Sequence, residues 1–133
     1  MDNSIYYNYT KEERLRFSRR LPLLRTLFGI TQEDLAAKLN VSRQTVSAME
    51  SSKILSNRDI LSILAVAVIE IRSNNTSSAK LDYEIMMRIL GDENDDLCNR
   101  LEEARISCGT TNGIGESRKR IIEAYKNYIS AKA

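Results

Sequence analysis

The sequence contains no histidine, no tryptophan and only two cysteines, and these absences narrow the functions open to it. Histidine is the commonest general base and the usual partner of a serine or cysteine nucleophile, so its absence predicts that the chain is not an enzyme. Cys98 and Cys108 are two thiols, whereas a structural zinc site takes four ligands. We therefore expect no metal and no other cofactor, and we interpret both cysteines as ordinary reduced residues.

Long hydrophobic runs are missing as well. No apolar stretch approaches the roughly 18 uninterrupted residues that a membrane span needs. Residues 1–4 lack the basic and then apolar pattern of a secretion signal. The expected location is the cytoplasm, and no membrane partner is expected.

Positive charge is concentrated in the first half of the chain. Residues 1–60 carry a net charge of +3, whereas residues 61–133 carry −1. Within the first part, residues 11–25 hold one lysine and five arginines against two glutamates, a net charge of +4. This pattern is typical either of a surface that binds an anionic partner or of a solvated helix face, and both interpretations stay open.

Capping signals and apolar periodicity predict an all-α protein. Three pairs have the spacing of a capping box, in which a side chain and a backbone N–H bond reciprocally at the start of a helix. They are Thr10 with Glu13, Thr31 with Asp34, and Ser56 with Asp59. Pro22 interrupts the first helix, where we expect either a kink or a restart. Residues 60–71 are apolar nearly all round, which predicts a helix central to the core or covered by a second subunit.

The polar segment 73–80 predicts a linker, and further helices are expected over 81–90, 92–107 and 116–131. The predicted organisation has four parts: an N-terminal arm and leading helix (1–17), a central domain (18–72), the linker (73–80) and a C-terminal helical region (81–133).

Residues 31–50 have the pattern of two short helices joined by a tight turn, the helix-turn-helix arrangement. Asn40 tolerates the left-handed conformation that such a turn needs. Ala36 is small where the helices would cross, and Val41, Val46 and Met49 are expected to pack beneath. Four side chains are then left facing outward at the front of the second helix: Arg43, Gln44, Ser47 and Ala48.

The run from Leu24 to Glu50 resembles the lambda-repressor/Cro-like family of bacterial and phage regulators, also called the XRE family, over roughly residues 18–70. The resemblance implies a lambda-repressor-like helical bundle that reads bases in the DNA major groove. It assigns base reading to Arg43, Gln44, Ser47 and Ala48, phosphate binding to Gln32, Ser42 and Lys53, and an internal salt bridge to Arg25 and Glu50. Arg pairs with guanine and Gln with adenine through two hydrogen bonds, which agrees with this assignment. Two departures, Ser52 for a usual Gly and Asn57 for a usual Pro, put the loop geometry and the Lys53 contact in question.

Arg19 and Arg20 follow a phosphate backbone or merely decorate a helix, and the sequence leaves both possibilities open. The expected function is sequence-specific binding of double-stranded DNA as a dimeric transcriptional repressor on a two-fold operator. Candidate dimer surfaces are the helices over 60–71 and 116–131. Three alternatives remain: an antitoxin whose C-terminal region binds a toxin protein, a helix-turn-helix used for protein interaction, and a C-terminal region that senses a small molecule.

Overall fold

The computed structural model describes residues 8–51, 54–73, 76–107, 109 and 113–132. The described residues form helices and no strands, so the predicted all-α class is confirmed. The helices are α1 (Lys11–Leu27), α2 (Gln32–Leu39), α3 (Arg43–Ser51), α4 (Asn57–Ser73), α5 (Thr76–Gly91), α6 (Asp96–Ser107) and α7 (Ile114–Lys132). None of them is both long and apolar enough to cross a membrane.

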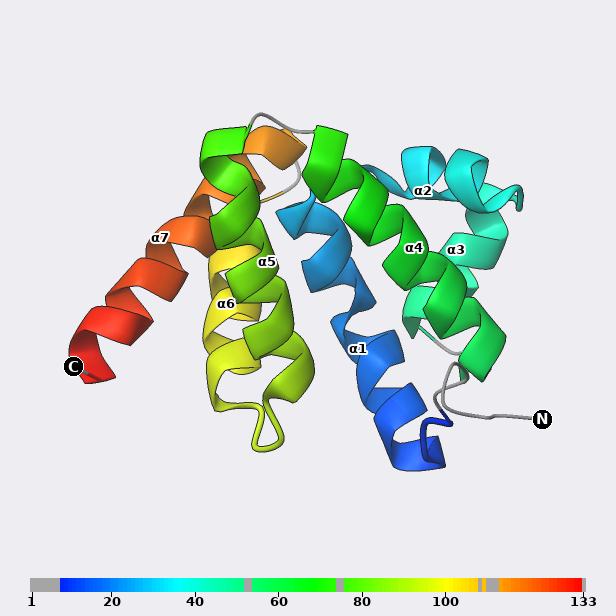
Figure 1. Cartoon of the computed structure of the whole chain (residues 1–133), viewed down its shortest axis with the longest axis horizontal. Helices are drawn as coiled ribbons and strands as arrows, with labels where there is room; N and C mark the ends of the chain where they lie inside the picture. The colour runs from blue at the N-terminus through cyan, green and yellow to red at the C-terminus, as the bar shows by residue number, and fades with distance from the viewer. Residues whose placement is uncertain (1–7, 52–53, 74–75, 108, 110–112, 133) are drawn as a thin grey trace.

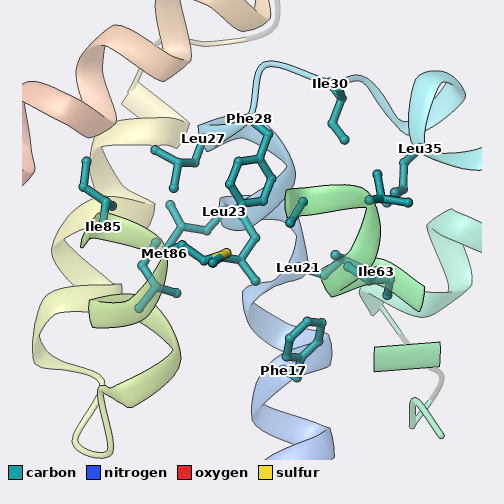
Figure 2. Packing of buried hydrophobic residues seen from close by; sticks show 14 of the residues in the cluster. Phe17, Leu21, Leu23, Leu27, Phe28, Ile30, Leu35, Ile63, Ile85 and Met86 are labelled. Carbon is teal, nitrogen blue, oxygen red and sulfur yellow. The ribbon is translucent and has the colours of Figure 1, made fainter. Parts of the chain in front are cut away.

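Helix α1 lies at the centre of the molecule. In Figure 1, α2, α3 and α4 lie on one side of it and α5, α6 and α7 on the other. Its side chains are buried on both sides: Figure 2 shows Leu21 toward Ile63 of α4, and Leu23 and Leu27 toward Ile85 and Met86 of α5. One aliphatic core therefore runs through both groups of helices.

The start of α1 follows the sequence signal. Thr10 accepts a hydrogen bond from the backbone N–H of Glu13 at 3.1 Å, and the Glu13 carboxylate accepts one from the Thr10 N–H at 2.9 Å. Of the two outcomes expected at Pro22, a kink or a restart, the restart does not occur, since α1 runs on to Leu27. The Thr26 hydroxyl donates to the Pro22 carbonyl at 2.8 Å, and burial on both sides of the proline holds the helix together.

Two arginines join α1 to the C-terminal helices. Arg20 of α1 is 5% exposed, and its guanidinium donates to the Ile89 carbonyl at 2.8 Å, to the Asp92 carbonyl and to the Asp95 carboxylate. Arg118 of α7 donates in turn to the Leu27 carbonyl at 2.8 Å, in the last turn of α1. Carbonyls at the ends of helices lack an intrahelical donor and carry partial negative charge, so a buried cation there satisfies both needs.

Arg118 also pairs with Asp82 of α5, whose Oδ1 lies 2.7 Å from its Nη2. Asp82 is fully buried and its other carboxylate oxygen has no hydrogen-bond partner. Burial raises the pKa of Asp82, although the nearby guanidinium acts in the opposite direction.

The predicted linker differs from the structure. Helix α5 begins at Thr76, so residues 76–80 are already helical, and residues 74–75 lie outside the described part of the chain. Serines and asparagines suggested a loop, yet the apolar face that starts at Ala79 and Leu81 packs on the core and continues the helix backward. The predicted 17/18 boundary falls inside α1.

Candidate nucleic-acid interface

Helix α2 begins and ends where local chemistry places its limits. Thr31 and Asp34 form the expected capping box, with two hydrogen bonds of 3.0 Å. The pKa of Asp34 is lowered, chiefly by the hydrogen bond that its carboxylate accepts from the Thr31 backbone N–H. At the other end Asn40 adopts the left-handed conformation, with φ 58° and ψ 45°. The Val41 N–H then bonds the Ala36 carbonyl at 3.0 Å, which turns the chain sharply.

Ser42 caps α3, as the sequence predicts. Its hydroxyl oxygen accepts from the Thr45 N–H at 3.1 Å, and the Val46 N–H bonds its carbonyl. Val46 and Met49 are buried under the helix, but Val41 is 37% exposed. The expectation that Val41 packs beneath the turn is therefore wrong.

The outer side of α3 presents the predicted base-reading residues. Arg43 and Gln44 are exposed, and Ser47 and Ala48 are half-buried one turn further on. The long polar side chains thus lie at the N-terminal end of the helix, where a helix in the major groove comes closest to base edges. Ser42, at the cap, is exposed beside them.

A chain of polar contacts connects Arg43 with the interior. Its Nη1 donates to the Gln32 Oε1 at 3.2 Å, and the Gln32 Nε2 donates to the Glu50 carboxylate at 2.8 Å. Glu50 also accepts from the Arg25 Nε at 2.8 Å, and Arg25 donates further to the Ile30 carbonyl at 3.1 Å. The salt bridge between Arg25 and Glu50 is 12% and 7% exposed, and it supports the arginine at the front of α3 through Gln32.

Contacts from α1 and α4 fix the two short helices. The buried Ser18 hydroxyl of α1 donates to the Met49 carbonyl in α3. The Lys38 ammonium of α2 lies 2.7 Å from the Glu70 carboxylate of α4. Since α3 is bonded from its buried side, its orientation depends on the position of α1.

Arg19 and Arg20 have different surroundings although they are adjacent. The Arg19 side chain is 59% exposed and lies 3.9 Å from Asp95, which leaves it open to another anion. Arg20 is buried with all its partners inside the protein, so its predicted contact with phosphate is contradicted by the structure. The helical positions alone did not distinguish them, because α5 and α6 determine which one is covered. Lys53 and Ser52 lie outside the described residues.

Asn57, singled out in the sequence as a departure from the family pattern, has a structural role. Its Oδ1 accepts from the Tyr9 N–H at 2.8 Å, which joins the segment before α1 to the first turn of α4. Proline could not make this contact because it has no side-chain acceptor. The Arg14 guanidinium donates to the Leu55 carbonyl at 3.3 Å nearby, so the loop before α4 is bonded to α1. Sequence reasoning missed these contacts, and it also missed Asp82 and Arg118.

The described part of the chain has no group of three or more His, Cys, Asp or Glu side chains suited to a metal ion. Cys98 is buried and unpaired, and burial raises the pKa of its thiol to about 12. The exposed side chains of Ser42, Arg43 and Gln44 give the outer side of α3 its hydrogen-bond donors and acceptors and its positive charge.

Comparison with known families agrees with this geometry. A helix-turn-helix family model matches residues 23–67, from the second half of α1 to within α4. No curated protein and no solved structure matches the chain. The matched segment contains α2, the turn at Asn40, the whole of α3 and the salt bridge that supports it. Residues 23–67 thus form a helix-turn-helix domain similar to those of the lambda-repressor-like XRE regulators, which supports a DNA-binding transcription regulator in general.

Proposed function

We propose that the protein is a sequence-specific transcriptional repressor that binds double-stranded DNA as a dimer on a two-fold operator. The observation that carries the proposal is the exposed pair Arg43 and Gln44 at the N-terminal end of a capped helix supported from within. A helix in this arrangement enters the major groove with its first residues against base edges. The site of action would be the cytoplasm.

The four outward residues of α3 divide the work by their chemistry. Arg43 would read guanine and Gln44 adenine, each through two hydrogen bonds. Ser47 offers a hydroxyl to either type of edge, and Ala48 an apolar contact to a thymine methyl. Ser42 and the half-buried Gln32 would bind phosphates, with the exposed Arg19 as a further cation. Repression would be steric, because a dimer on its operator occupies the DNA that polymerase needs.

One helix contacts only a few base pairs, so specific binding requires a second half-site about one helical turn away. Selection of bound duplexes from a random DNA pool tests this part of the proposal. We expect a palindromic consensus with half-site centres about 10 base pairs apart or a multiple of that. Failure to enrich any sequence would refute sequence-specific binding.

Arg43→Ala tests the reading residue directly. We expect it to cost about 1–3 kcal/mol in affinity for the selected duplex and to relax preference at one base position. Arg120→Ala is the matched control, since Arg120 is a 53% exposed arginine of α7 away from α3. It should leave both quantities unchanged. Equal affinity of the Arg43→Ala protein and the unchanged protein would overturn the assignment.

A further inference from the structure

A small cavity lies where the N-terminal half of α1 meets the C-terminal end of α5. Its volume is about 90 Å³, and it is partly open to solvent. The residues that line it come from the segment before α1, from α1 and from α5: Tyr9, Glu13, Arg16, Phe17, Arg20 and Leu90. Figure 2 shows the Phe17 ring apart from the α1 side chains that pack on α5. Tyr9, Phe17 and Leu90 give the cavity an apolar surface, and two arginines against one glutamate give it a net positive charge.

Arg16 is the cation of this cavity that is available to a ligand. Its side chain is half-buried, and among the described residues its guanidinium has no hydrogen bond and no ion pair. Arg20 is bonded to main-chain carbonyls and to Asp95 within the protein. The Glu13 carboxylate accepts from the Thr10 N–H at 2.9 Å in the capping box. A half-buried guanidinium without a partner favours an anion, and it binds a carboxylate through two parallel hydrogen bonds.

The nearest competing anion acts mainly on the neighbouring arginines. The pKa of Asp95 is lowered chiefly by the hydrogen bond from Arg20, and Arg16 contributes least of the three arginines around it. Asp95 also lies 3.9 Å from Arg19. The charge of Arg16 is therefore left largely uncompensated within the protein.

Bonds within the protein hold the walls of the cavity in place. The Tyr9 N–H donates to the Asn57 side chain at 2.8 Å, which holds the segment before α1 on α4. The Arg20 guanidinium donates to the Ile89 carbonyl at 2.8 Å, and this bond holds the end of α5, with Leu90, on α1. A preformed site costs its ligand little ordering of the protein.

We propose that this cavity binds a short-chain aliphatic carboxylate, with its carboxylate on Arg16 and its hydrocarbon chain against Phe17 and Leu90. Volume limits the chain, because a cavity of about 150 Å³ holds one benzene molecule, or about 25 Å³ for each carbon. The smaller cavity of this protein thus accommodates about three or four carbons. Inorganic phosphate and nucleotides fit poorly, because their polar oxygens would lie against the apolar wall without hydrogen-bond partners.

The site is separate from the outer side of α3, so its occupancy can be tested without DNA. The same helix α1 bonds α3, since the Ser18 hydroxyl donates to the Met49 carbonyl. A bound carboxylate therefore contacts the helix that orients the predicted base-reading residues.

Titration of the full chain with sodium isobutyrate, followed by NMR of labelled leucine and isoleucine methyl groups, tests the proposal. We expect saturable shifts of the Leu90 methyl signals with a dissociation constant on the order of 1 mM, as a ligand of about six heavy atoms allows. The methyl signals of Ile106, which is 61% exposed on α6, should stay in place. Absence of saturation of the Leu90 shifts by about 50 mM isobutyrate would overturn the proposal.

Three other probes separate the charged part of the ligand from its apolar part. Isobutyramide has the same shape without the charge, and acetate has the charge with two carbons fewer. Each should bind at least about tenfold more weakly than isobutyrate, because one loses the charge-assisted hydrogen bonds and the other loses buried hydrocarbon. Inorganic phosphate should not shift the Leu90 signals. Affinity equal to that of isobutyrate for any of the three would overturn the proposed ligand class.

Arg16→Gln tests the residue that holds the carboxylate. We expect the affinity for isobutyrate to fall at least about tenfold, because the amide keeps polarity at this position and loses the charge. Arg19→Gln is the matched control, since Arg19 is a 59% exposed arginine of the same helix that does not line the cavity, and it should leave the affinity unchanged. Circular dichroism of both variants establishes that they are folded. Unchanged affinity in Arg16→Gln, or an equal loss in the two variants, would mean an adventitious ion only and would overturn the site.

Discussion

Replacement of Arg20 by methionine tests whether the C-terminal helices are part of the same folding unit as α1. Methionine keeps the length of the apolar stem but removes the donors to Ile89, Asp92 and Asp95. Removal of one member of a buried ion pair costs about 3–5 kcal/mol. The lower figure applies, because the Asp95 side chain is 36% exposed and water can solvate it once the arginine is gone.

We therefore expect Arg20→Met to lower the free energy of unfolding by about 3 kcal/mol, a large fraction of the about 5–15 kcal/mol of a typical domain. Urea denaturation followed by circular dichroism measures this change. Arg19→Met is the matched control, because it removes the same positive charge at the adjacent position, and Arg19 also lies beside Asp95. With its side chain 59% exposed and 3.9 Å from Asp95, Arg19 should contribute less than about 1 kcal/mol.

Two results would refute this reasoning. The first is an equal loss of stability in the two variants, which would mean that the buried contacts of Arg20 contribute nothing beyond a surface charge. The second concerns the slope of the logarithm of the DNA-binding constant against the logarithm of the salt concentration. A decrease of about one in the magnitude of this slope for Arg20→Met, measured under conditions where the protein is folded, would refute the reasoning. Such a decrease is the signature of a lost phosphate contact.

Two further predictions concern the same helices. A fragment that ends at residue 75 should show no cooperative thermal transition. Loss of α5 to α7 exposes Leu23 and Leu27, which are 1% and 0% exposed in the full chain, and exposure of each side chain costs about 1.5–3 kcal/mol of stability. A folded fragment that binds DNA would contradict this prediction. The pKa of Asp95 is held below its usual range, chiefly by the hydrogen bond from Arg20. The ionised carboxylate therefore stabilises the fold above a pH of about 4, and this contribution disappears as the pH falls through the lowered pKa. Urea titrations between about pH 5 and pH 2, where a carboxylate with a lowered pKa takes up its proton, should show a shallower acid loss of stability in Asp95→Asn. An unchanged slope would refute the assignment. Asp82 has the opposite sign, since its raised pKa makes the fold less stable as pH rises through that value.

Local chemistry made much of the helix-turn-helix predictable. The Thr31 capping box, the left-handed Asn40 and the Ser42 cap each involve residues within a few positions of one another, so the sequence contains all the information that they need. The same holds for the start of α1 at Thr10. The Arg25 and Glu50 pair is more distant in sequence, and it was predicted only because a family pattern supplied the partner.

The errors arose where distant segments decide the outcome. Arg19 and Arg20 are neighbours on one helix, and their opposite exposures follow from contacts with α5 and α6 some 70 residues away. The helical conformation of residues 76–80 was missed for a related reason, since packing of Leu81 on the core extends α5 into a polar segment. Asp82 and Arg118 carry no local signal that would pair them across 36 positions.

The two arginines that reach helix ends have a consequence for how this protein can vary. Arg20 and Arg118 both bond main-chain carbonyls, which every amino acid supplies. Aliphatic residues of α5 and α7 can therefore be exchanged for others of similar volume while these helices keep their position along α1. Lysine is a poor substitute at either position, because a single ammonium cannot span two acceptors in the fixed plane of a guanidinium. Natural variants should thus retain arginine at 20 and 118 while the surrounding hydrophobic side chains drift.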